Sequence, residues 1–232
     1  MDLFEAVQKR RSVRRFKAET FPDDIIRRAL EAAILAPNSS NTQTWDFHWI
    51  KNPELKAKVV KACLSQSAAR TAAQIVVVTA DPKNWRRSQP KLTEWVKMLG
   101  MPKPVILYYE KLIPISYTAG PLSLYGPFKW LSAFIVGLFR PITRGPYSKA
   151  ELDLVAAKSA ALACENFVLA ITAQGGSTCM MEGFDEWRMK SALKLPMSTR
   201  VVMAIGIGYE GERATWGQQF RLPLEEVVHI YE

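Results

Sequence analysis

Apolar residues recur at helical spacing in five stretches of the chain and form β-branched or alternating runs in three others. The helical pattern predicts helices over residues 2–10, 21–36, 53–64, 148–173 and 184–195. The other runs predict strands at residues 45–50, 74–80 and 201–208, and the last two are uninterrupted enough to be buried on both faces. Because helices and strands do not alternate strictly as β-α-β units, the pattern favours an α+β fold.

Local signals mark the ends of the first and the longest of these helices. Asp2 is placed to cap the first helix, on which Leu3 and Val7 are expected to face the core. Ser148 and Glu151 form a capping-box pattern at the start of the longest helix, and a pair of glycines follows its end. These signals predict that the longest helix is continuous over residues 148–173.

The middle of the chain, residues 101–147, has a different composition. It holds seven of the 14 prolines, five of the seven tyrosines and a single acidic residue, Glu110. Residues 130–139 form an uncharged apolar run, but ten residues are too few to span a bilayer, which needs about 20. We therefore expect one domain over residues 1–232, with an aromatic-rich insertion or lid at about 101–147.

Composition and charge narrow the class of protein. The chain has 232 residues, 48% of them hydrophobic and 23% charged, which is ordinary for a globular protein and excludes a disordered tail or a fibre. Its formal charge of +9 favours anionic partners such as phosphate ligands, nucleic acid or an acidic membrane surface. The spacing of Cys63, Cys164 and Cys179 does not suit a zinc site. We expect free thiols, no metal, no signal peptide at the acidic start of the chain, and a cytoplasmic protein.

A basic run crosses the end of the first predicted helix. Arg10, Arg11 and Arg14 lie within one helical turn or its exit, and Ser12 adds a hydroxyl. Arginine can bind two phosphate oxygens at once, so the run suits a phosphate monoester. A solvated basic face, or an anchor for acidic lipid or RNA, would explain the same residues.

Three further segments carry candidate binding groups. Residues 37–43 are rich in Asn, Ser and Gln, which suit the polar edge of a heterocycle, although a loop that ends a helix has the same composition. Residues 175–183 contain three glycines that would let a ligand approach the backbone, or that form only a helix C-cap and a tight turn. Arg221 becomes relevant if the tail folds back onto the basic run.

The chain offers few groups for acid–base or nucleophilic catalysis. His48 and His229 are its only histidines, and it has no serine-hydrolase elbow, zinc-protease motif or paired-carboxylate signature. We therefore expect no catalytic side chain, and a bound cofactor that supplies the reactivity.

Taken together and in this order, these segments resemble the FMN-dependent nitroreductase family of NAD(P)H:acceptor oxidoreductases. Arg10-Arg11-Ser12-Val13-Arg14-Arg15-Phe16 resembles the family's R-[RH]-S-x-[RK]-x-F phosphate motif, and residues 36–45 resemble its A-P-S-x-x-N-x-Q-P-W loop. Residues 181–185 resemble its segment beside the flavin ring, and residues 221–228 resemble its C-terminal phosphate residue and tail. The resemblance covers roughly residues 1–100 and 148–232.

The resemblance implies an α+β homodimer with a central mixed or antiparallel sheet flanked by helices, and with two FMN sites at an intertwined interface. It assigns FMN binding to residues of the four motifs: Arg10, Arg11, Ser12, Arg14, Pro37, Asn38, Ser39, Asn41, Glu182, Gly183 and Arg221. The loop from Pro37 to Asn41 would come from the other subunit. Glu182 and Gly183 would face the flavin through their backbone N–H groups.

The implied reaction is a ping-pong transfer, in which NAD(P)H passes hydride to flavin N5 and leaves before an electron-poor acceptor such as a nitroaromatic or a quinone takes its place. Thr44 and Asn38 depart from the family's Pro and Ser, and Arg70 is the nearest candidate for a basic residue beside flavin N1. We expect residues 101–147 to act as a substrate lid lined by six aromatic side chains: Tyr108, Tyr109, Tyr117, Tyr125, Phe128 and Trp130.

Three alternatives stay open at this point. Another flavin enzyme on the same scaffold, such as a reductive dehalogenase, a flavin reductase or an ene-reductase, would carry the same FMN motifs. A basic protein that binds nucleic acid would explain the charge but not the order of the motifs, so we expect no nucleic-acid partner. The basic-flanked apolar segment 129–144 suits contact with an anionic membrane, although we favour packing against the dimer or the flavin pocket.

Overall fold

The centre of the molecule is a four-stranded antiparallel sheet with the strand order β1–β2–β4–β3. The computed structural model describes the backbone of residues 1–232 and every side chain except that of Leu122. The strands are β1 (Trp45–Ile50), β2 (Gln74–Ala80), β3 (Ser177–Met181) and β4 (Arg200–Gly208). This sheet confirms the α+β class, and β1, β2 and β4 lie where the apolar pattern predicts strands.

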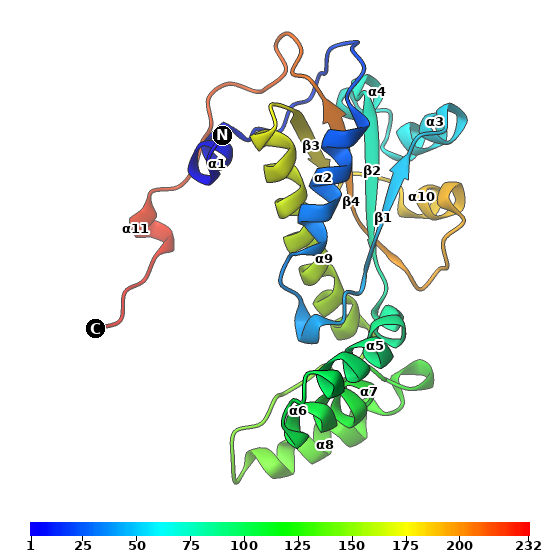
Figure 1. Ribbon diagram of the computed structural model, residues 1–232, viewed down its shortest axis with the longest axis vertical. Coiled ribbons are helices and arrows are strands. Elements are labelled where there is room, and N and C mark those ends of the chain that lie inside the picture. The colour runs from blue at the N-terminus through cyan, green and yellow to red at the C-terminus, as the bar shows by residue number, and fades with distance from the viewer.

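Helices cover both faces of the sheet (Figure 1). One face carries α2 (Asp23–Ile34) and α9 (Lys149–Ala173), and the other carries α3 (Pro53–Ala62), α4 (Ser67–Thr71) and α10 (Glu186–Leu193). Neighbouring residues of a strand point to opposite faces, so Val76 of β2 packs with Phe167 of α9, whereas Val77 packs on the side of Met189. The two central strands are therefore buried on both faces, as their uninterrupted apolar sequence predicts.

Helix α9 is the longest helix described and packs against the sheet. It begins at the predicted capping box, in which Ser148 accepts from the Glu151 N–H, and it ends just before Gly175. Among the described residues it is the one helix that is long and apolar enough to cross a membrane, with a mean hydropathy of 1.6 over its best window. Phe167 and Ile171 are fully buried against the sheet, so its position in the core accounts for that composition.

Two sequence-based expectations are wrong. Leu3 and Val7 of α1 (Leu3–Lys9) do not face the core, because Ala6 is the residue that this helix buries and Leu3 is 63% exposed. Strand β3 lies where the sequence predicts no strand, because Thr178 is the one β-branched residue of Ser177–Met181. Both differences concern the edge of the molecule, where a residue's surroundings decide more than its own preference.

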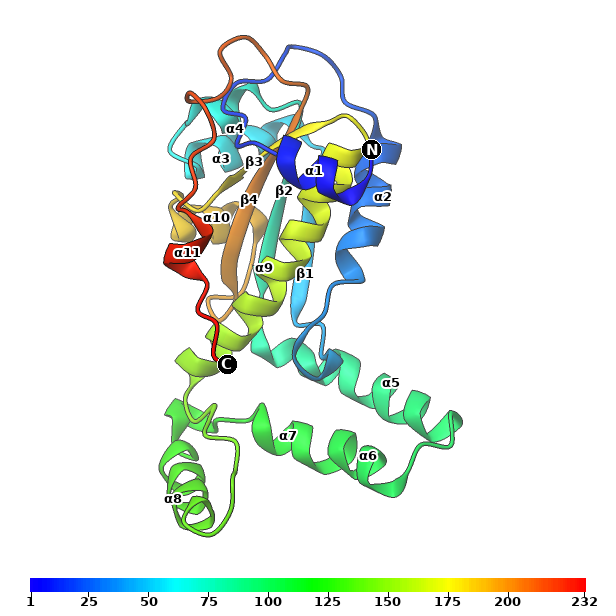
Figure 2. The same ribbon diagram turned by 90° about the vertical axis from the view of Figure 1, so that its left-hand side faces the viewer.

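Beyond one end of the sheet lies a group of helices that we call the helical arm, residues 85–147 (Figures 1 and 2). Its main elements are α5 (Trp85–Met98), α6 (Lys103–Leu107), a π-helical turn (Tyr108–Leu112), α7 (Ile113–Ser116), a 3-10 turn (Pro121–Ser123) and α8 (Gly126–Gly137). A small apolar cluster of Trp85, Ile113 and Tyr117 joins the arm to Leu152 at the start of α9. The arm thus has only a minor core of its own.

The C-terminal tail, residues 216–232, leaves the body of the molecule and includes the short helix α11 (Leu224–Val227) (Figure 1). All of its side chains are exposed, although Phe220, Ile230 and Tyr231 are large and apolar or aromatic. Leu3 and Phe4 of α1 are exposed in the same way. The single chain therefore leaves the apolar side chains of α1 and the tail open to solvent.

Candidate active site

The basic segment Arg10–Phe16 follows the end of α1 and is not helical, so its arginines lie at the exit of the helix and not within one turn. It runs along the end of the sheet, where the Val13 N–H donates to the Thr178 carbonyl at 2.9 Å and the Arg14 N–H donates to the Ala214 carbonyl at 2.7 Å. Phe16 is buried beside Gly208, and a Cβ at that glycine would lie 3.1 Å from the Phe16 ring. The glycine therefore lets the segment lie flat against β4.

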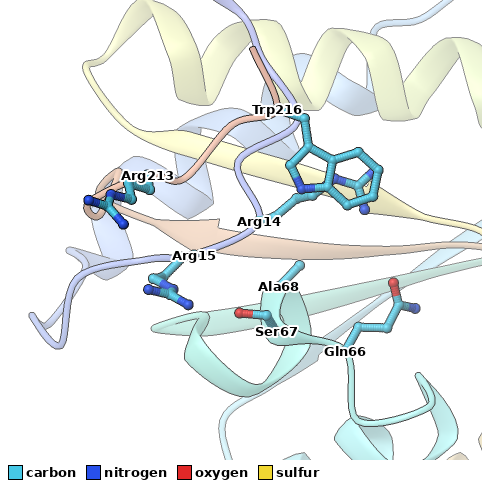
Figure 3. A pocket seen from close by; sticks show the side chains of 7 residues that line it. All are labelled: Arg14, Arg15, Gln66, Ser67, Ala68, Arg213 and Trp216. Carbon is cyan, nitrogen blue, oxygen red and sulfur yellow. The ribbon is translucent and has the colours of Figure 1, made fainter.

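A cavity of about 300 Å³ opens beside this segment (Figure 3). It is lined by Arg14, Arg15, Gln66, Ser67, Ala68, Arg213 and Trp216. The lining holds three guanidinium groups and no carboxylate, so its electrostatic character favours an anion. The Arg14 guanidinium lies 3.8 Å from the centre of the Trp216 ring, a cation–π contact that holds it over the cavity.

The other residues of the predicted phosphate motif lead up to this cavity without lining it. Arg11 donates to the Gly217 carbonyl at 2.8 Å, and Arg10 lies 3.9 Å from the Glu165 carboxylate of α9. Ser12 is exposed and forms a parallel β-bridge with Thr178 of β3. Arg10, Arg11 and Arg14 thus link the N-terminal segment to α9 and to the start of the tail.

The end of β3 reaches the same region. The Gly183 carbonyl accepts a hydrogen bond of 2.6 Å from the Gln66 side chain, which itself lines the cavity. Glu182 and Gly183 are exposed, and within the described part of the chain neither of their N–H groups has an acceptor. A Cβ at Gly183 would meet nothing closer than 3.7 Å, so this backbone is open to a ligand.

The Pro37–Gln43 loop lies at the other end of α2. Ser40, Asn41 and Gln43 all have φ near +50°, a left-handed conformation that non-glycine residues rarely adopt and that is frequent at functional sites. The loop is held by Asn38, whose side chain accepts from the Gln43 N–H at 2.9 Å, and by a bond from the Ser39 N–H to Ser159 of α9. Its shape is therefore fixed before any ligand binds.

The basic cavity and this loop do not meet within one chain. Helix α2 has 12 residues and lies between them, which corresponds to about 18 Å at about 1.5 Å per residue. The two groups of predicted binding residues consequently lie at opposite ends of the molecule's helical layer (Figures 1 and 2).

The predicted lid residues fall into two groups. Tyr108 and Tyr117 contact the Pro37–Gln43 loop, since the Tyr108 and Ser40 hydroxyls are 2.5 Å apart and the Tyr117 hydroxyl donates to the Ser39 carbonyl at 3.2 Å. Tyr109 lies edge-on to Tyr108 with 5.2 Å between the ring centres. The second group lies at α8, away from the loop: Tyr125, Phe128 and Trp130, all of them exposed.

Arg221 lies in the exposed tail, where its guanidinium donates to the neighbouring Phe220 carbonyl at 2.7 Å. Within the described residues it makes no contact with the N-terminal arginines. The single chain therefore brings Arg10, Arg11, Ser12, Arg14, Glu182 and Gly183 to one end, and leaves Pro37, Asn38, Ser39, Asn41 and Arg221 elsewhere.

Titratable groups near the site favour binding over nucleophilic chemistry. Burial raises the pKa of the Cys63 thiol to about 11 and that of Cys164 to about 12. Burial also raises the pKa of Cys179, against an opposing effect of the Arg14 charge. All three thiols are free, as expected, and are protonated near neutral pH.

The sequence pattern does not identify several of the residues that line the cavity. Arg15 stands inside the quoted motif without an assigned role, and Arg213 and Trp216 lie in a segment that has no pattern of its own. Arg70, the candidate for a positive charge near the ligand, is exposed on α4 and is not among the lining residues. The left-handed φ of Leu64 and Ser65, just before Gln66, is a structural signal of this turn that the sequence does not carry.

The chain is similar to several known proteins. The family model described as the Nitroreductase family matches residues 7–209 of the chain. The NADH dehydrogenase of Thermus thermophilus is 23% identical over 98% of this chain and 95% of its own, and iodotyrosine deiodinase 1 of Sus scrofa is 23% identical over 98% of this chain and 68% of its own. A solved complex with FMN from Exiguobacterium sibiricum has a TM-score of 0.73 at 21% identity, over 100% of this chain and 98% of that one, which shows a shared fold.

Proposed function

The chain belongs to the nitroreductase family, and on that premise we propose that it binds FMN and passes hydride from NAD(P)H to an electron-poor acceptor such as a nitroaromatic or a quinone. The observation that carries the proposal is the cavity beside the Arg10–Phe16 segment, whose lining includes Arg14, Arg15 and Arg213 and no carboxylate. A phosphate-bearing polar cofactor fits that donor set better than an apolar ligand does. The names of the NADH dehydrogenase relative and of the FMN complex support the reductant and the cofactor.

We assign the phosphate and the ribityl chain to Arg10, Ser12, Arg14 and Arg221, with Arg11 along the flavin. The contacts of Arg14 with Trp216 and of Arg11 with Gly217 support this assignment, because they orient two guanidinium groups before binding. Arg221 would reach the site only after the tail changes course.

The remaining half of each site would come from a second copy of the chain. Pro37, Asn38, Ser39 and Asn41 form a fixed polar loop that lies about the length of α2 from the basic cavity. The exposed apolar side chains of α1 and of the tail support a homodimer, since a second copy would remove them from water. We treat residues 1–232 as one domain whose sites are completed between two copies.

FMN, when bound, supplies a carrier that accepts hydride at N5 and passes it to the second substrate. The protein's own contribution is positioning and charge. The free N–H groups of Glu182 and Gly183 would donate to the edge of the ring, and the arginines near the cavity would favour a negatively charged ligand there. Tyr108 and Tyr117 would border the acceptor's space through their contacts with the polar loop.

Reductive dehalogenation is the second candidate function. Iodotyrosine deiodinase 1 matches almost the whole chain, and the same cofactor site would serve that reaction. A panel of acceptors that contains a nitroaromatic, a quinone, a free flavin, an activated alkene and a halophenol separates these reactions, with turnover measured under both NADH and NADPH.

The test of the cofactor is the absorption spectrum of the purified protein, followed by heat release and chromatography of the chromophore. We expect FMN near one per subunit. Arg14→Gln should weaken FMN binding about tenfold to a hundredfold, since a hydrogen bond to a charged group contributes about 1.5–3 kcal/mol. Arg28→Gln is the matched control, because Arg28 forms a surface ion pair with Asp24 and lies outside the cavity lining. A protein that stays colourless after incubation with FMN would overturn the proposal.

A further inference from the structure

Helix α8 of the helical arm buries small residues and exposes large apolar ones. Its inward positions are the small residues Gly126 and Ala133, both buried, and the half-buried Gly137. Its outward face carries large apolar side chains at helical spacing: Phe128, Leu131, Ile135 and Leu138, which are 73%, 49%, 49% and 65% exposed. A helix at the surface of a globular protein normally has the opposite arrangement.

The chain that follows α8 keeps the helix in this orientation. Residues 144–147 pack against its glycines: a Cβ at Gly126 would lie 2.6 Å from the Tyr147 carbonyl oxygen, and one at Gly137 would lie 2.5 Å from the Arg144 guanidinium. At Gly126 the contact is with backbone, so a larger side chain there would displace Tyr147. The helix therefore cannot turn its apolar face into the protein without displacing this packing.

The charged residues between Glu110 and Glu151 are all basic, and the Glu151 carboxylate accepts from the Tyr147 N–H. Residues 111–150 contain no acidic residue and five basic ones: Lys111, Lys129, Arg140, Arg144 and Lys149. Lys129 points inward and donates to the Ser116 carbonyl at 3.2 Å, whereas Arg140 and Arg144 are exposed just beyond the end of the helix. Trp130 stacks on Phe134 with 5.5 Å between the ring centres, and Trp130 and Tyr125 are exposed. Aromatic rings and arginines at the border of an apolar strip are typical of segments at a membrane interface.

We propose that α8, together with Arg140 and Arg144, docks on the surface of an anionic lipid bilayer. The apolar face would enter the boundary of the acyl chains while the two arginines contact lipid headgroups. At 12 residues, or about 18 Å, α8 is too short to span the bilayer's hydrocarbon core of about 30 Å, so it would lie in the plane of the interface.

Helix α8 suits lipid better than it suits a second α8, because the charged residues at its C-terminal end are all positive. It lies at the opposite end of the molecule from α1 and from the Arg10–Phe16 segment (Figures 1 and 2). The exposed side chains of α1 and the tail already form a separate surface that a second copy would cover. Two copies meeting at α8 would also bring their Arg140 and Arg144 side chains together with no acidic residue nearby in the sequence.

Flotation of the full-length protein with lipid vesicles tests this proposal, since it needs no flavin and no turnover. The probes are vesicles of phosphatidylcholine alone and of phosphatidylcholine with phosphatidylglycerol, at low and high salt. The wild type should float with the anionic vesicles at low salt and separate from them at high salt. A triple variant, Phe128→Ser, Leu131→Ser and Ile135→Ser, should lower the partition coefficient by about a thousandfold, since each buried large apolar side chain contributes about tenfold.

Two further variants separate the contributions. Arg140→Gln with Arg144→Gln should lower binding to anionic vesicles by about twenty- to thirtyfold, at about fivefold for each basic residue. Trp187→Ser is the matched control, because Trp187 of α10 is 74% exposed but lies away from the arm, and it should float like the wild type. Circular dichroism of each variant checks that the fold is intact.

Three results would overturn the proposal. The first is a wild type that floats with neither kind of vesicle. The second is flotation that the triple variant leaves unchanged. The third is a fall in oligomer mass for the triple variant, by light scattering, without any wild-type flotation, which would identify α8 as a contact between copies of the chain.

Discussion

The body of the molecule and the helical arm are both rich in apolar residues, but they place them on opposite sides. In the body, α9 directs Phe167 and Ile171 onto the sheet, and both side chains are fully buried. In the arm, α8 directs Phe128 and Leu138 away from the protein. Apolar composition thus predicts that a segment will be covered, but only the fold decides whether the cover is the protein itself or a partner.

The largest expected difference in stability between the body and the arm comes from removing one large side chain from each. Phe167→Ala should lower the free energy of unfolding by about 3–5 kcal/mol, because it leaves a cavity between α9 and the sheet. Phe128→Ala should change it by less than about 0.5 kcal/mol, because that ring is exposed in the single chain. Urea denaturation followed by circular dichroism measures both. Equal losses for the two variants would show that α8 is part of the core.

A smaller effect is expected at the joint between the two regions. Tyr117 is buried, and its hydroxyl donates to the Ser39 carbonyl and lies 3.2 Å from the Thr42 hydroxyl. Tyr117→Phe removes this link between arm and loop and should cost about 0.5–1.5 kcal/mol of stability. Tyr125→Phe is the control, because the Tyr125 hydroxyl has no hydrogen bond among the described residues. Amide hydrogen exchange in the Pro37–Gln43 loop should then be faster in Tyr117→Phe than in the wild type and unchanged in Tyr125→Phe. Unchanged exchange in Tyr117→Phe would contradict the proposed link between Tyr117 and the loop.

The smallest expected effect is a pH dependence confined to the sheet. Burial on β1 lowers the pKa of His48 below its ordinary value of 6.5, although the nearby Asp46 charge opposes the shift. The unfolded chain then binds more protons, so stability is complete above about pH 6.5 and falls as the pH drops through the folded pKa. The arm contains no histidine, so we expect no contribution from it to the pH dependence of stability near pH 6.5.

Denaturation curves from about pH 5 to pH 8 measure this effect, which we expect to stay below about 0.5 kcal/mol because His48 is only partly buried. His48→Gln can keep a hydrogen bond to Thr79 and should flatten the stability curve in that range. A slope that persists in His48→Gln would assign the titration to another group.

The sequence predicts the body of the fold better than its edges. The bounds of β1 and β2 follow from alternating and β-branched residues, and the start of α9 follows from Ser148 and Glu151. Strand β3 could not be found, because its partner β4 determines its conformation rather than its own residues. Helix α5 was not foreseen either, since it is largely polar and contains Pro90.

In the candidate site, too, the sequence predicts some of the residues and not others. The arginine motif is local in sequence and could be predicted, but Gln66, Arg213 and Trp216 reach the cavity from segments far apart along the chain. They meet because Phe16 packs on Gly208 and fixes the path of the N-terminal segment. Contacts of this kind depend on the shape of the core, which no short pattern of residues specifies.

The length of α2 has a consequence for the cell. If each flavin site joins the basic cavity of one chain to the polar loop of another, the fraction of sites that hold FMN depends on the association of two chains as well as on the affinity for FMN. FMN would then act as the ligand that selects the assembled pair and would stabilise it by about 2.7 kcal/mol at a hundred times its dissociation constant. Dilution would release flavin from intact chains, and the supply of flavin would limit how many pairs persist.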